Sequence, residues 1–205
     1  MLDPITTKWI KPPLKIAADK LNKIGITPNQ ITIFGFLVGI SAIPALYLRE
    51  YYVALGLIVI NRILDGLDGA LARETRPTDA GGFLDITLDF IFYSGIIFGF
   101  ALADPQTNAL AAAALIFAFI GTSSSFLAFA VMATKNSIES VVYPNKSLYY
   151  LGGLTEGTET IILFVLICLF PRYFPLMAYV FAGTCWLTTI LRIVAGYTTL
   201  KKMLN

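Results

Sequence analysis

The sequence predicts an all-α integral membrane protein, with six transmembrane helices preceded by an amphipathic helix on the membrane surface. Three observations support this fold class. Hydrophobic residues make up 57% of the 205 residues and charged residues only 14%, against roughly 25% in soluble domains. The mean hydropathy is +0.74. Apolar runs long enough to cross the hydrocarbon layer, which takes about 20 residues, recur along the chain.

The N-terminal segment is the least apolar part of the chain. We treat it as a juxtamembrane unit, 1–27, ahead of a transmembrane unit, 28–205. Lysines and apolar residues alternate at near-helical spacing after Pro12 and Pro13, which is typical of a short amphipathic helix on lipid headgroups. The other interpretation is a solvated, disordered tail. The segment lacks the apolar run and cleavage site of a secretory signal.

Six apolar segments follow and are predicted to span the membrane. They lie at about 29–48, 52–73, 82–103, 108–134, 151–170 and 174–199, separated by charged residues or prolines. An even number of spans places both termini on one side. Eleven Lys and Arg residues fall on that side and two on the other, so the positive-inside rule predicts cytosolic termini.

Composition excludes several kinds of chemistry. The chain contains no histidine, which rules out histidine bases, nucleophiles and metal ligands. The net charge of +2 comes from 15 basic and 13 acidic residues. Such a balance gives no indication of a nucleic-acid partner.

Four aspartates stand where a membrane helix normally avoids charge. Asp65 and Asp68 are spaced i, i+3 in the second span, and Asp85 and Asp89 are spaced i, i+4 in the third. Each pair lies on one helix face, and the short connection between the spans lets the faces meet. Oxygen ligands alone favour Mg²⁺, Mn²⁺ or Ca²⁺, and Mg²⁺ commonly completes its shell with substrate phosphates. The pattern predicts a divalent-cation site and a phosphate-bearing substrate.

Small residues are interleaved with these aspartates. Gly66, Gly69 and Ala72 reduce bulk along the second span, and Gly81 does so at the start of the third. Two interpretations are open, namely close helix packing and the approach of a ligand to the backbone. Arg73 follows the small residues, and its planar guanidinium is suited to binding a phosphate.

These residues carry a resemblance to a known family. The CDP-alcohol phosphotransferase signature is D-x-x-D-G-x-x-A-R, G-x-x-x-D-x-x-x-D. Similar segments here are Asp65-Gly-Leu-Asp68-Gly69-Ala-Leu-Ala72-Arg73 and Gly81-Gly-Phe-Leu-Asp85-Ile-Thr-Leu-Asp89. All eight fixed positions are present within 25 residues. The loop from Arg73 to Gly81 is shorter than the family usually has, which affects only the contacts of that loop.

The resemblance implies an integral membrane enzyme that transfers a substituted phosphate from a CDP-linked donor to an alcohol and releases CMP. It implies one or two Mg²⁺ or Mn²⁺ ions held by Asp65, Asp68, Asp85 and Asp89, with Asp89 also the base for the acceptor hydroxyl. The residues implied at the nucleotide site are Gly66, Gly69, Ala72, Arg73, Gly81, Pro28, Asn29 and Thr32. The last three are equally typical of a helix start, with Thr27 as N-cap and Pro28 in the first turn.

Polar residues on the later spans are the candidates for binding the acceptor. They are Lys135, Glu156, Glu159 and Arg192. Glu156 and Glu159 share a helix face but are equally typical of a capping turn at a helix N-terminus. Lys135 is also typical of a positive-inside anchor. Arg192 lies within a span, where an arginine needs a partner. Arg62, one turn before the aspartates, either competes with Arg192 for such a partner or forms a salt bridge to the aspartates.

We expect a CDP-linked lipid such as CDP-diacylglycerol as donor and a small polar alcohol as acceptor, in phospholipid biosynthesis. The sequence does not name the alcohol. The alternative is the reverse direction, in which a soluble CDP-alcohol gives its headgroup phosphate to a lipid hydroxyl. A divalent-cation transporter is a third interpretation because aspartates within spans also mark ion pathways. We find no internal repeat, the four aspartates lie toward one side in two consecutive helices, and the fourth and sixth spans carry no matching acidic ladder.

The expected partners are the lipid donor, the alcohol and the surrounding membrane lipids. The family resemblance and the aromatic residues Phe90, Phe92 and Tyr93 on the third span also predict a homodimer. The expected location is a bacterial or archaeal inner or plasma membrane, with the active site facing the cytosol.

Overall fold

The computed structural model describes residues 3–136 and 153–202, and side chains from Pro12 onward within these ranges. The regular structure there is helical, with no strand, which confirms the all-α prediction. The helices are α1 Asp3–Lys23, α2 Pro28–Ile40, α3 Ala42–Tyr47, α4 Tyr51–Glu74, α5 Asp79–Ala103, α6 Pro105–Lys135, α7 Gly157–Leu169 and α8 Phe174–Lys202, with a 3-10 helix, η1, at Pro171–Tyr173. The predicted loop from Lys135 to Lys146 lies almost wholly outside the described residues.

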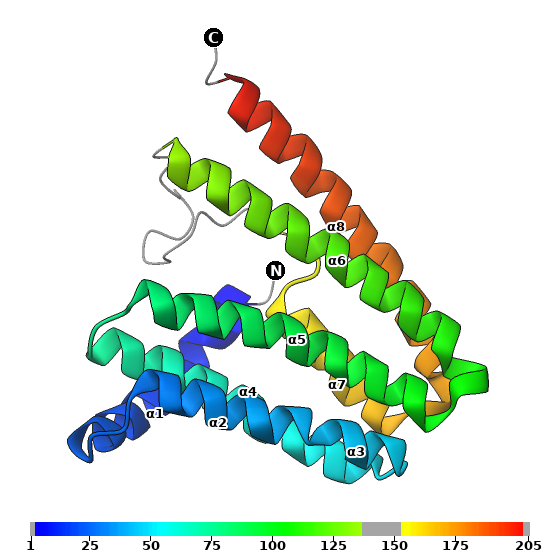
Figure 1. Cartoon of the computed structure of the whole chain (residues 1–205), viewed down its shortest axis with the longest axis horizontal. Coiled ribbons are helices and arrows are strands. Elements are labelled where there is room, and N and C mark those ends of the chain that lie inside the picture. Colours follow the sequence, from blue (N-terminus) through cyan, green and yellow to red (C-terminus); the bar gives the residue numbers. More distant parts are fainter. Residues whose placement is uncertain (1–2, 137–152, 203–205) are drawn as a thin grey trace.

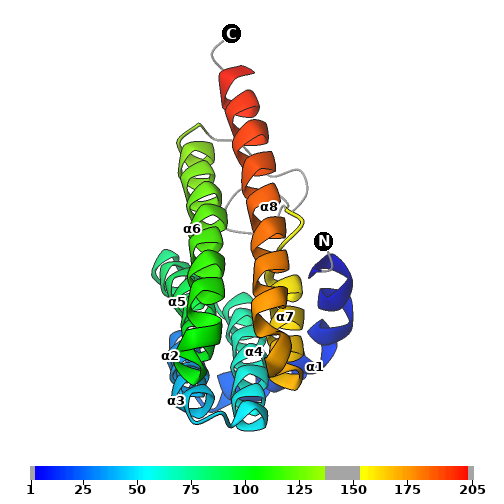
Figure 2. The same cartoon turned by 90° about the vertical axis from the view of Figure 1, so that its right-hand side faces the viewer.

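The helices form two groups that are connected by α5. In the first group, α2 and α3 pack on α4, and α1 lies along α4 (Figure 1). In the second, α6 packs along α8, and this pair extends beyond the other helices toward the C-terminal end (Figure 2). Helix α5 contacts α2 and α3 on one side and α6 on the other, while α7 contacts α4 and α8. The aspartate-bearing part of α5 therefore borders both groups.

Four helical segments are long and apolar enough to cross a membrane. They are Pro28–Tyr47, Asp79–Ala103, Pro105–Lys135 and Pro171–Lys202. Helix α4 has 24 residues and is long enough to cross a membrane. It contains more charged residues than any of these four segments, so its composition is less typical of a membrane span. Helix α7 has 13 residues, or about 20 Å at the usual helical rise, and is shorter than the hydrocarbon layer. The described part of the predicted segment 151–170 is helical only from Gly157 to Leu169.

The N-terminal helix starts earlier than the sequence predicts. Helix α1 begins at Asp3 and runs through Pro12 and Pro13, whereas we expected a helix only after the two prolines. Proline has no N–H to donate to the preceding turn, so the pattern favoured a break there. The helix packs on α4 through its second half, and this tertiary contact outweighs the local preference.

One face of α1 is packed against α4. Leu14, Ala18 and Leu21 recur at helical spacing and contact Ala70 and Leu71 of α4. Ala18 is fully buried. An ion pair of 3.5 Å joins the Nζ atom of Lys15 to Oε1 of Glu74 at the end of α4. Helix α4, which carries Asp65 and Asp68, is therefore covered on one side by α1.

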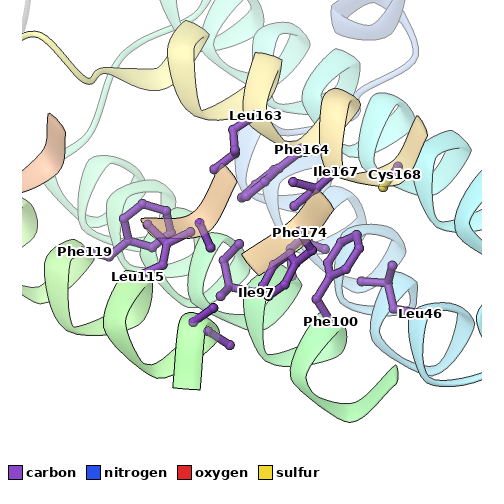
Figure 3. Close-up of a cluster of buried hydrophobic side chains, with 14 of the residues drawn as sticks. Leu46, Ile97, Phe100, Leu115, Phe119, Leu163, Phe164, Ile167, Cys168 and Phe174 are labelled. Carbon is purple, nitrogen blue, oxygen red and sulfur yellow. The ribbon is translucent and has the colours of Figure 1, made fainter. Parts of the chain in front are cut away.

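The main hydrophobic core lies between α3, α4, α5, α6, α7 and α8, and Figure 3 shows part of it. The rings of Phe100 and Phe174 stack with centroids 4.8 Å apart. Phe92 of α5 meets the ring of Phe164 of α7 edge-on at 6.1 Å. These contacts fix α5 against α7 and α8, and so fix the orientation of the α5 aspartates.

Of the three aromatic residues that we expected at a dimer contact, one is buried inside the protomer and two are half-buried. Phe92 is fully buried, and Phe90 and Tyr93 line a cavity between α5, α6, α7 and α8. The 3.6-residue helical repeat indicates which residues share a face but not which face is covered within the chain. The homodimer stays a prediction, without Phe92 as part of its contact.

Substitution of Gly99 tests the close approach of α3 to α5. A Cβ atom at Gly99 would lie 2.7 Å from Leu46 Cδ1 and 3.2 Å from Leu46 Cβ, whereas one at the exposed Gly56 would meet nothing within 4 Å. Overpacking costs about 1 to 3 kcal/mol, and an unhindered Gly to Ala change in a helix gains up to about 1 kcal/mol. We therefore expect Gly99→Ala to lower the thermal unfolding temperature in detergent and Gly56→Ala to leave it unchanged or raise it. Equal unfolding temperatures for the two variants would contradict the packing described.

Candidate active site

Three carboxyl groups from α4 and α5 come together. Oxygen atoms of Asp65, Asp68 and Asp85 lie within 4.8 Å of one another. Asp68 is buried, at 4% exposure, and the other two are half-buried. The i, i+3 spacing on α4 places Asp65 and Asp68 on one face, and α2 packs on both α4 and α5 beside them.

The donor set of this cluster fits a hard divalent cation. It consists of carboxylate oxygens, without sulfur or imidazole, as Mg²⁺ and Mn²⁺ prefer. Two like unit charges about 5 Å apart repel by roughly 3 kcal/mol at an effective dielectric near 20. A bound cation would replace this repulsion by attraction, so the grouping Asp65, Asp68 and Asp85 can hold a metal ion.

Thr32 of α2 orients one member of the cluster. Its hydroxyl donates a hydrogen bond to Asp68 Oδ2 at 2.5 Å. This bond fixes the side-chain rotation of Asp68 and occupies one of its lone pairs. Thr32 was predicted at the nucleotide site, and the structure places it directly beside the carboxylate cluster.

Asp89 is engaged by Arg62 and Tyr93. The Nη2 atom of Arg62 donates to Asp89 Oδ1 at 2.7 Å, and the hydroxyl of Tyr93 donates to Asp89 Oδ2 at 3.4 Å. Arg62 Nη1 also lies 3.6 Å from Asp65 Oδ2. Of the two alternatives for Arg62, the salt bridge to the aspartates is therefore the one observed.

Arg62 is held from several sides. Its Nε atom donates to Asn61 Oδ1 at 2.7 Å, and its Nη1 atom donates to the Tyr93 hydroxyl at 3.1 Å. The guanidinium carbon lies 4.7 Å from the Phe92 ring centroid and 5.3 Å from that of Tyr93. Asn61 in turn donates to the carbonyl of Gly35 at 2.8 Å. The guanidinium thus has a fixed place next to Asp89.

Two cavities meet at the α5 aspartates. A small one is lined by all four aspartates together with Thr32 and Arg62. A larger one, of about 240 Å³, lies between α5, α6, α7 and α8 and is bordered by Asp85 and Asp89. Its polar lining further includes Tyr93, Thr122, Ser123, Thr155, Glu156, Thr160 and Arg192. Asp85 and Asp89 therefore face both spaces.

The four acceptor candidates separate into two pairs. Arg192 and Glu156 line the larger cavity, whereas Glu159 and Lys135 do not. Arg192 is buried, at 7% exposure, and its Nη1 atom donates to the carbonyl of Thr122 at 3.2 Å. Lys135 lies in the last turn of α6 and is exposed, which fits the anchor interpretation.

The capping interpretation of Glu156 and Glu159 is correct, and Glu156 borders the cavity as well. The two residues form a capping box at the start of α7, in which Glu159 Oε2 accepts from the Glu156 N–H at 3.1 Å. Just before it, the N–H and hydroxyl of Thr155 donate to the hydroxyl of Thr188 on α8 at 3.1 and 2.9 Å. The capping box and the hydrogen bonds from Thr155 to Thr188 fix the first turn of α7 at Gly157. They also hold this wall of the cavity in place.

The remaining nucleotide candidates lie in different surroundings. Thr27 caps α2 and Pro28 occupies its first turn, as the helix-start interpretation predicts. Asn29 Oδ1 would lie 3.0 Å from a Cβ atom at Gly81, so this pair is in close contact.

The small residues of α4 also face different neighbours. A Cβ atom at Gly66 would meet Leu14 of α1 at 2.9 Å, so Gly66 serves helix packing. Gly69 faces the guanidinium of Arg73. Arg73 is exposed near the end of α4, and Ala72 is half-buried.

Sequence reasoning missed several residues of the site. The Tyr93 hydroxyl contacts Asp89, and Asn61 orients Arg62. Asn61 stands as a polar residue in an apolar run one residue before Arg62, which is a signal of a buried polar network. Tyr93 is four residues after Asp89 and so shares its helix face.

Comparison with known proteins decides the family. The sequence profile described as CDP-alcohol phosphatidyltransferase matches residues 25–194. The chain belongs to the CDP-alcohol phosphatidyltransferase family. It is therefore a CDP-alcohol phosphotransferase, a membrane transferase of phospholipid biosynthesis, as its signature predicted. Over 203 residues it is 57% identical to the inner membrane protein YnjF of Escherichia coli K12, covering 99% of this chain and 98% of that protein.

Two further proteins are similar to the chain. An archaetidylinositol phosphate synthase of Pyrococcus horikoshii is 44% identical over 103 residues, covering 50% of this chain and 54% of that protein. The phosphatidylinositol phosphate synthase PgsA1 of Mycobacterium tuberculosis shares the fold. With CDP-DAG bound it has a TM-score of 0.73 at 20% identity, covering 90% of this chain and 94% of that chain. In complex with manganese and citrate it has a TM-score of 0.72 at 21% identity, covering 90% and 89%.

Replacement of Thr32 tests the orientation of Asp68. Partners that orient a metal-binding carboxylate typically contribute tenfold or more to metal affinity. We expect Thr32→Val, which keeps the shape and removes the hydroxyl, to weaken Mn²⁺ binding by about tenfold, as measured by metal titration of the purified protein. Thr32→Ser keeps the donor and is expected to bind Mn²⁺ like the wild type. Unchanged affinity in Thr32→Val would show that the hydrogen bond does not matter for the cluster.

Proposed function

We propose that the chain transfers a phosphatidyl group from a CDP-linked lipid, such as CDP-diacylglycerol, to the hydroxyl of a small polar alcohol, releasing CMP. One observation carries this proposal. Asp89 borders both the small cavity of the carboxylate cluster and the larger polar cavity. A donor bound at the first and an acceptor bound in the second would therefore both lie next to this carboxyl group. The fold shared with PgsA1, solved with CDP-DAG bound, supports the lipid donor.

We propose Mg²⁺ or Mn²⁺ as the cofactor. Asp65, Asp68 and Asp85 would hold it, and its charge would neutralise the donor diphosphate and the departing CMP. Manganese in a complex of PgsA1 supports this choice. Asp89, which we also expected among the ligands, stays a proposed ligand and forms a salt bridge with Arg62 in this structure.

The chain's residues would then carry out the transfer as follows. The larger cavity holds the acceptor with one hydroxyl next to Asp89, and Asp89 accepts the proton of that hydroxyl. The acceptor oxygen forms a bond to the lipid-bearing phosphorus, and the bond from that phosphorus to the CMP oxygen breaks. Holding both substrates in place supplies much of the acceleration, and the proton leaves the hydroxyl late in a loose phosphoryl transfer.

We propose that the nucleotide lies along the exposed end of α4. Gly69, Ala72 and Arg73 of α4 would border it, with Gly81 of α5 opposite. The start of α2, with Pro28, Asn29 and Thr32, would complete the site. Gly66 is left out of this set because Leu14 occupies the space beside it.

The acceptor we propose is a small alcohol with several hydroxyl groups. The cavity offers the hydroxyls of Thr122, Ser123 and Thr160 together with one carboxylate, Glu156, and one guanidinium, Arg192. These side chains can form hydrogen bonds with several hydroxyl groups of an acceptor. The single guanidinium can pair with no more than one anionic group on it. Similarity to two synthases whose names contain inositol phosphate supports a cyclic or linear polyol of this kind.

We further propose a six-span arrangement in the bacterial inner membrane, in which α4 and α7 join the four long apolar segments. Both termini and the aspartates face the cytosol, and α1 lies on the inner membrane surface as a juxtamembrane unit, 1–27, ahead of the unit 28–205. The inner membrane location of the Escherichia coli relative supports this placement. A homodimer completes the proposal.

The first test is CMP release by the purified enzyme in detergent. With CDP-diacylglycerol, Mn²⁺ or Mg²⁺ and a panel of polyols, we expect metal-dependent CMP release with one acceptor. Removal of a general base typically costs 100-fold or more, so Asp89→Asn is expected to reduce release at least about 100-fold while folding normally in size-exclusion chromatography. Full activity in Asp89→Asn would refute the assigned role.

A labelling experiment distinguishes the two directions of transfer. We expect label from CDP-diacylglycerol carried on the acyl chains to enter a new, more polar lipid. Label from the headgroup of a soluble CDP-alcohol is expected to stay out of lipid. The opposite pattern would assign the chain to headgroup transfer, and absence of both, with intact protein, would favour cation transport.

Replacement of Arg192 tests the acceptor cavity. Loss of hydrogen bonds from a charged group costs about 1.5 to 3 kcal/mol, so Arg192→Met is expected to raise the acceptor KM at least about tenfold. The donor KM is expected to stay within twofold. Lys135→Met removes a cation outside the cavity and serves as the matched control, with both constants unchanged. An unchanged acceptor KM in Arg192→Met, or an equal rise of the acceptor KM in both variants, would contradict this placement.

A further inference from the structure

We propose that the larger cavity selects an acceptor without a phosphate group, and that Glu156 at the start of α7 is the residue that excludes a phosphorylated one. This inference rests on the proposed function and deepens it, because it narrows the acceptor from small polyols in general to unphosphorylated ones. Three features of the cavity wall support it, namely its charges, the start of α7 and the direction of its hydroxyl groups.

The charged residues that line the cavity are mostly acidic. Among the described residues they are the carboxylates of Asp85, Asp89 and Glu156 and the guanidinium of Arg192. A phosphate ester carries a charge of about −1.5 to −2 at neutral pH. The proposed metal ion adds positive charge beside Asp85, but the donor diphosphate uses that charge. A second phosphate, on the acceptor, would therefore depend on Arg192 alone.

Arg192 is engaged in connecting α8 to α6. Its Nη1 atom donates to the carbonyl of Thr122 at 3.2 Å, and its guanidinium carbon lies 5.7 Å from the Phe126 ring centroid. The backbone of Gly153 covers another side, since a Cβ atom there would lie 3.1 Å from Nη2. Arg192 thus presents only a small surface to the cavity. Such a surface suits one hydrogen bond to a hydroxyl group better than the bidentate pairing by which arginine binds phosphate.

The start of α7 is closed to a phosphate by the chain's own carboxylate. The N–H groups and the dipole of a helix N-terminus attract anions, and this N-terminus borders the cavity at Glu156 and Gly157. The Glu156 side chain accepts from the N–H of Glu159 in the capping box and from the N–H of Gly153 at 2.9 Å. A phosphate at this place would meet a fixed negative charge, and like charges side by side disfavour binding.

Three hydroxyl groups of the cavity wall can only accept hydrogen bonds from a ligand. Thr122 and Thr160 donate their hydroxyl protons to backbone carbonyls of the preceding turn at 3.0 and 2.9 Å, and Thr155 donates to Thr188 at 2.9 Å. A hydroxyl group has one proton and two lone pairs, so the lone pairs remain for the cavity. They suit the O–H groups of a polyol, whereas phosphate oxygens also only accept and would be left without partners.

Glu156 therefore opposes a phosphorylated acceptor by its charge, and the hydroxyl groups oppose it by the direction of their hydrogen bonds. Selectivity between similar ligands commonly depends on such a repulsive element as well as on attractive contacts. The transfer would then give a lipid phosphodiester whose headgroup ends in hydroxyl groups, with no terminal phosphate.

The test compares each polyol with its own phosphate ester. Purified protein in detergent receives CDP-diacylglycerol, Mn²⁺ and a panel of such pairs, among them glycerol with glycerol 3-phosphate and myo-inositol with myo-inositol 1-phosphate. CMP release gives kcat/KM for each acceptor. In the pair that supports transfer, we expect the free polyol to exceed its ester at least about tenfold.

The outcomes of this comparison separate the inference from the proposed function. Equal kcat/KM values within the active pair, or a preference for the ester, would overturn the inference and leave the proposed function intact. Absence of CMP release with every acceptor would overturn the proposed function and the inference with it.

Two variants of the capping box assign the selectivity to Glu156. Glu156→Gln removes the charge and keeps an oxygen for the N–H groups of Gly153 and Glu159. We expect the ratio of kcat/KM for the ester to kcat/KM for the free polyol to rise at least about tenfold. Glu159→Gln is the matched control, because Glu159 belongs to the same capping box but does not line the cavity, and its ratio is expected to equal that of the wild type.

The ratio distinguishes a role in selectivity from a role in folding. A loosened start of α7 would lower kcat/KM for both acceptors and leave their ratio unchanged, so an unchanged ratio in Glu156→Gln would overturn the role of Glu156. The same rise in both variants would overturn it as well. If Glu156→Gln does not fold, the comparison of polyol and ester in the wild type still decides whether the cavity excludes a phosphate.

Discussion

The need to accommodate four carboxyl groups within a largely apolar helix bundle governs the structure around them. Arg62 offsets part of their charge from inside the bundle, through a salt bridge of 2.7 Å to Asp89 and a longer one of 3.6 Å to Asp65. Thr32 and Tyr93 donate to carboxylate oxygens that Arg62 does not reach. A buried carboxylate deprived of such partners is strongly destabilising, so these contacts are a condition of folding as well as of chemistry.

This network requires α4 and α5 to lie close to α2, and glycines on α2 allow that close approach. A Cβ atom at Gly35 would lie 3.0 Å from Leu64 Cβ, and one at Gly39 would lie 2.8 Å from both Asn61 and Phe92. The absence of side chains at these glycines lets α4 and α5 approach α2. Thr32 reaches Asp68 for the same reason. The active site therefore depends on a helix that contributes none of the four aspartates.

The sequence predicts the helical fold class and the meeting of Asp65, Asp68 and Asp85, because helical spacing fixes which side chains share a face. It does not predict that Asp89 pairs with Arg62, since this depends on how α4 and α5 are rotated about their axes. Capping and ligand binding use the same residue types, so the pattern could not separate them at Glu156 and Glu159. The start of α7 depends on hydrogen bonds from Thr155 to Thr188 across 33 positions of the chain, which no local pattern contains.

The contacts at Gly39 have a consequence for how this sequence can change over time. Gly39, Asn61 and Phe92 belong to three helices and to no common motif, yet they share the space beside Arg62. A larger residue at position 39 would clash with both Asn61 and Phe92 in their present positions. Accepted substitutions at these positions have to occur in combination, so covariation among descendants of this chain is expected there, while the aspartates themselves stay constant.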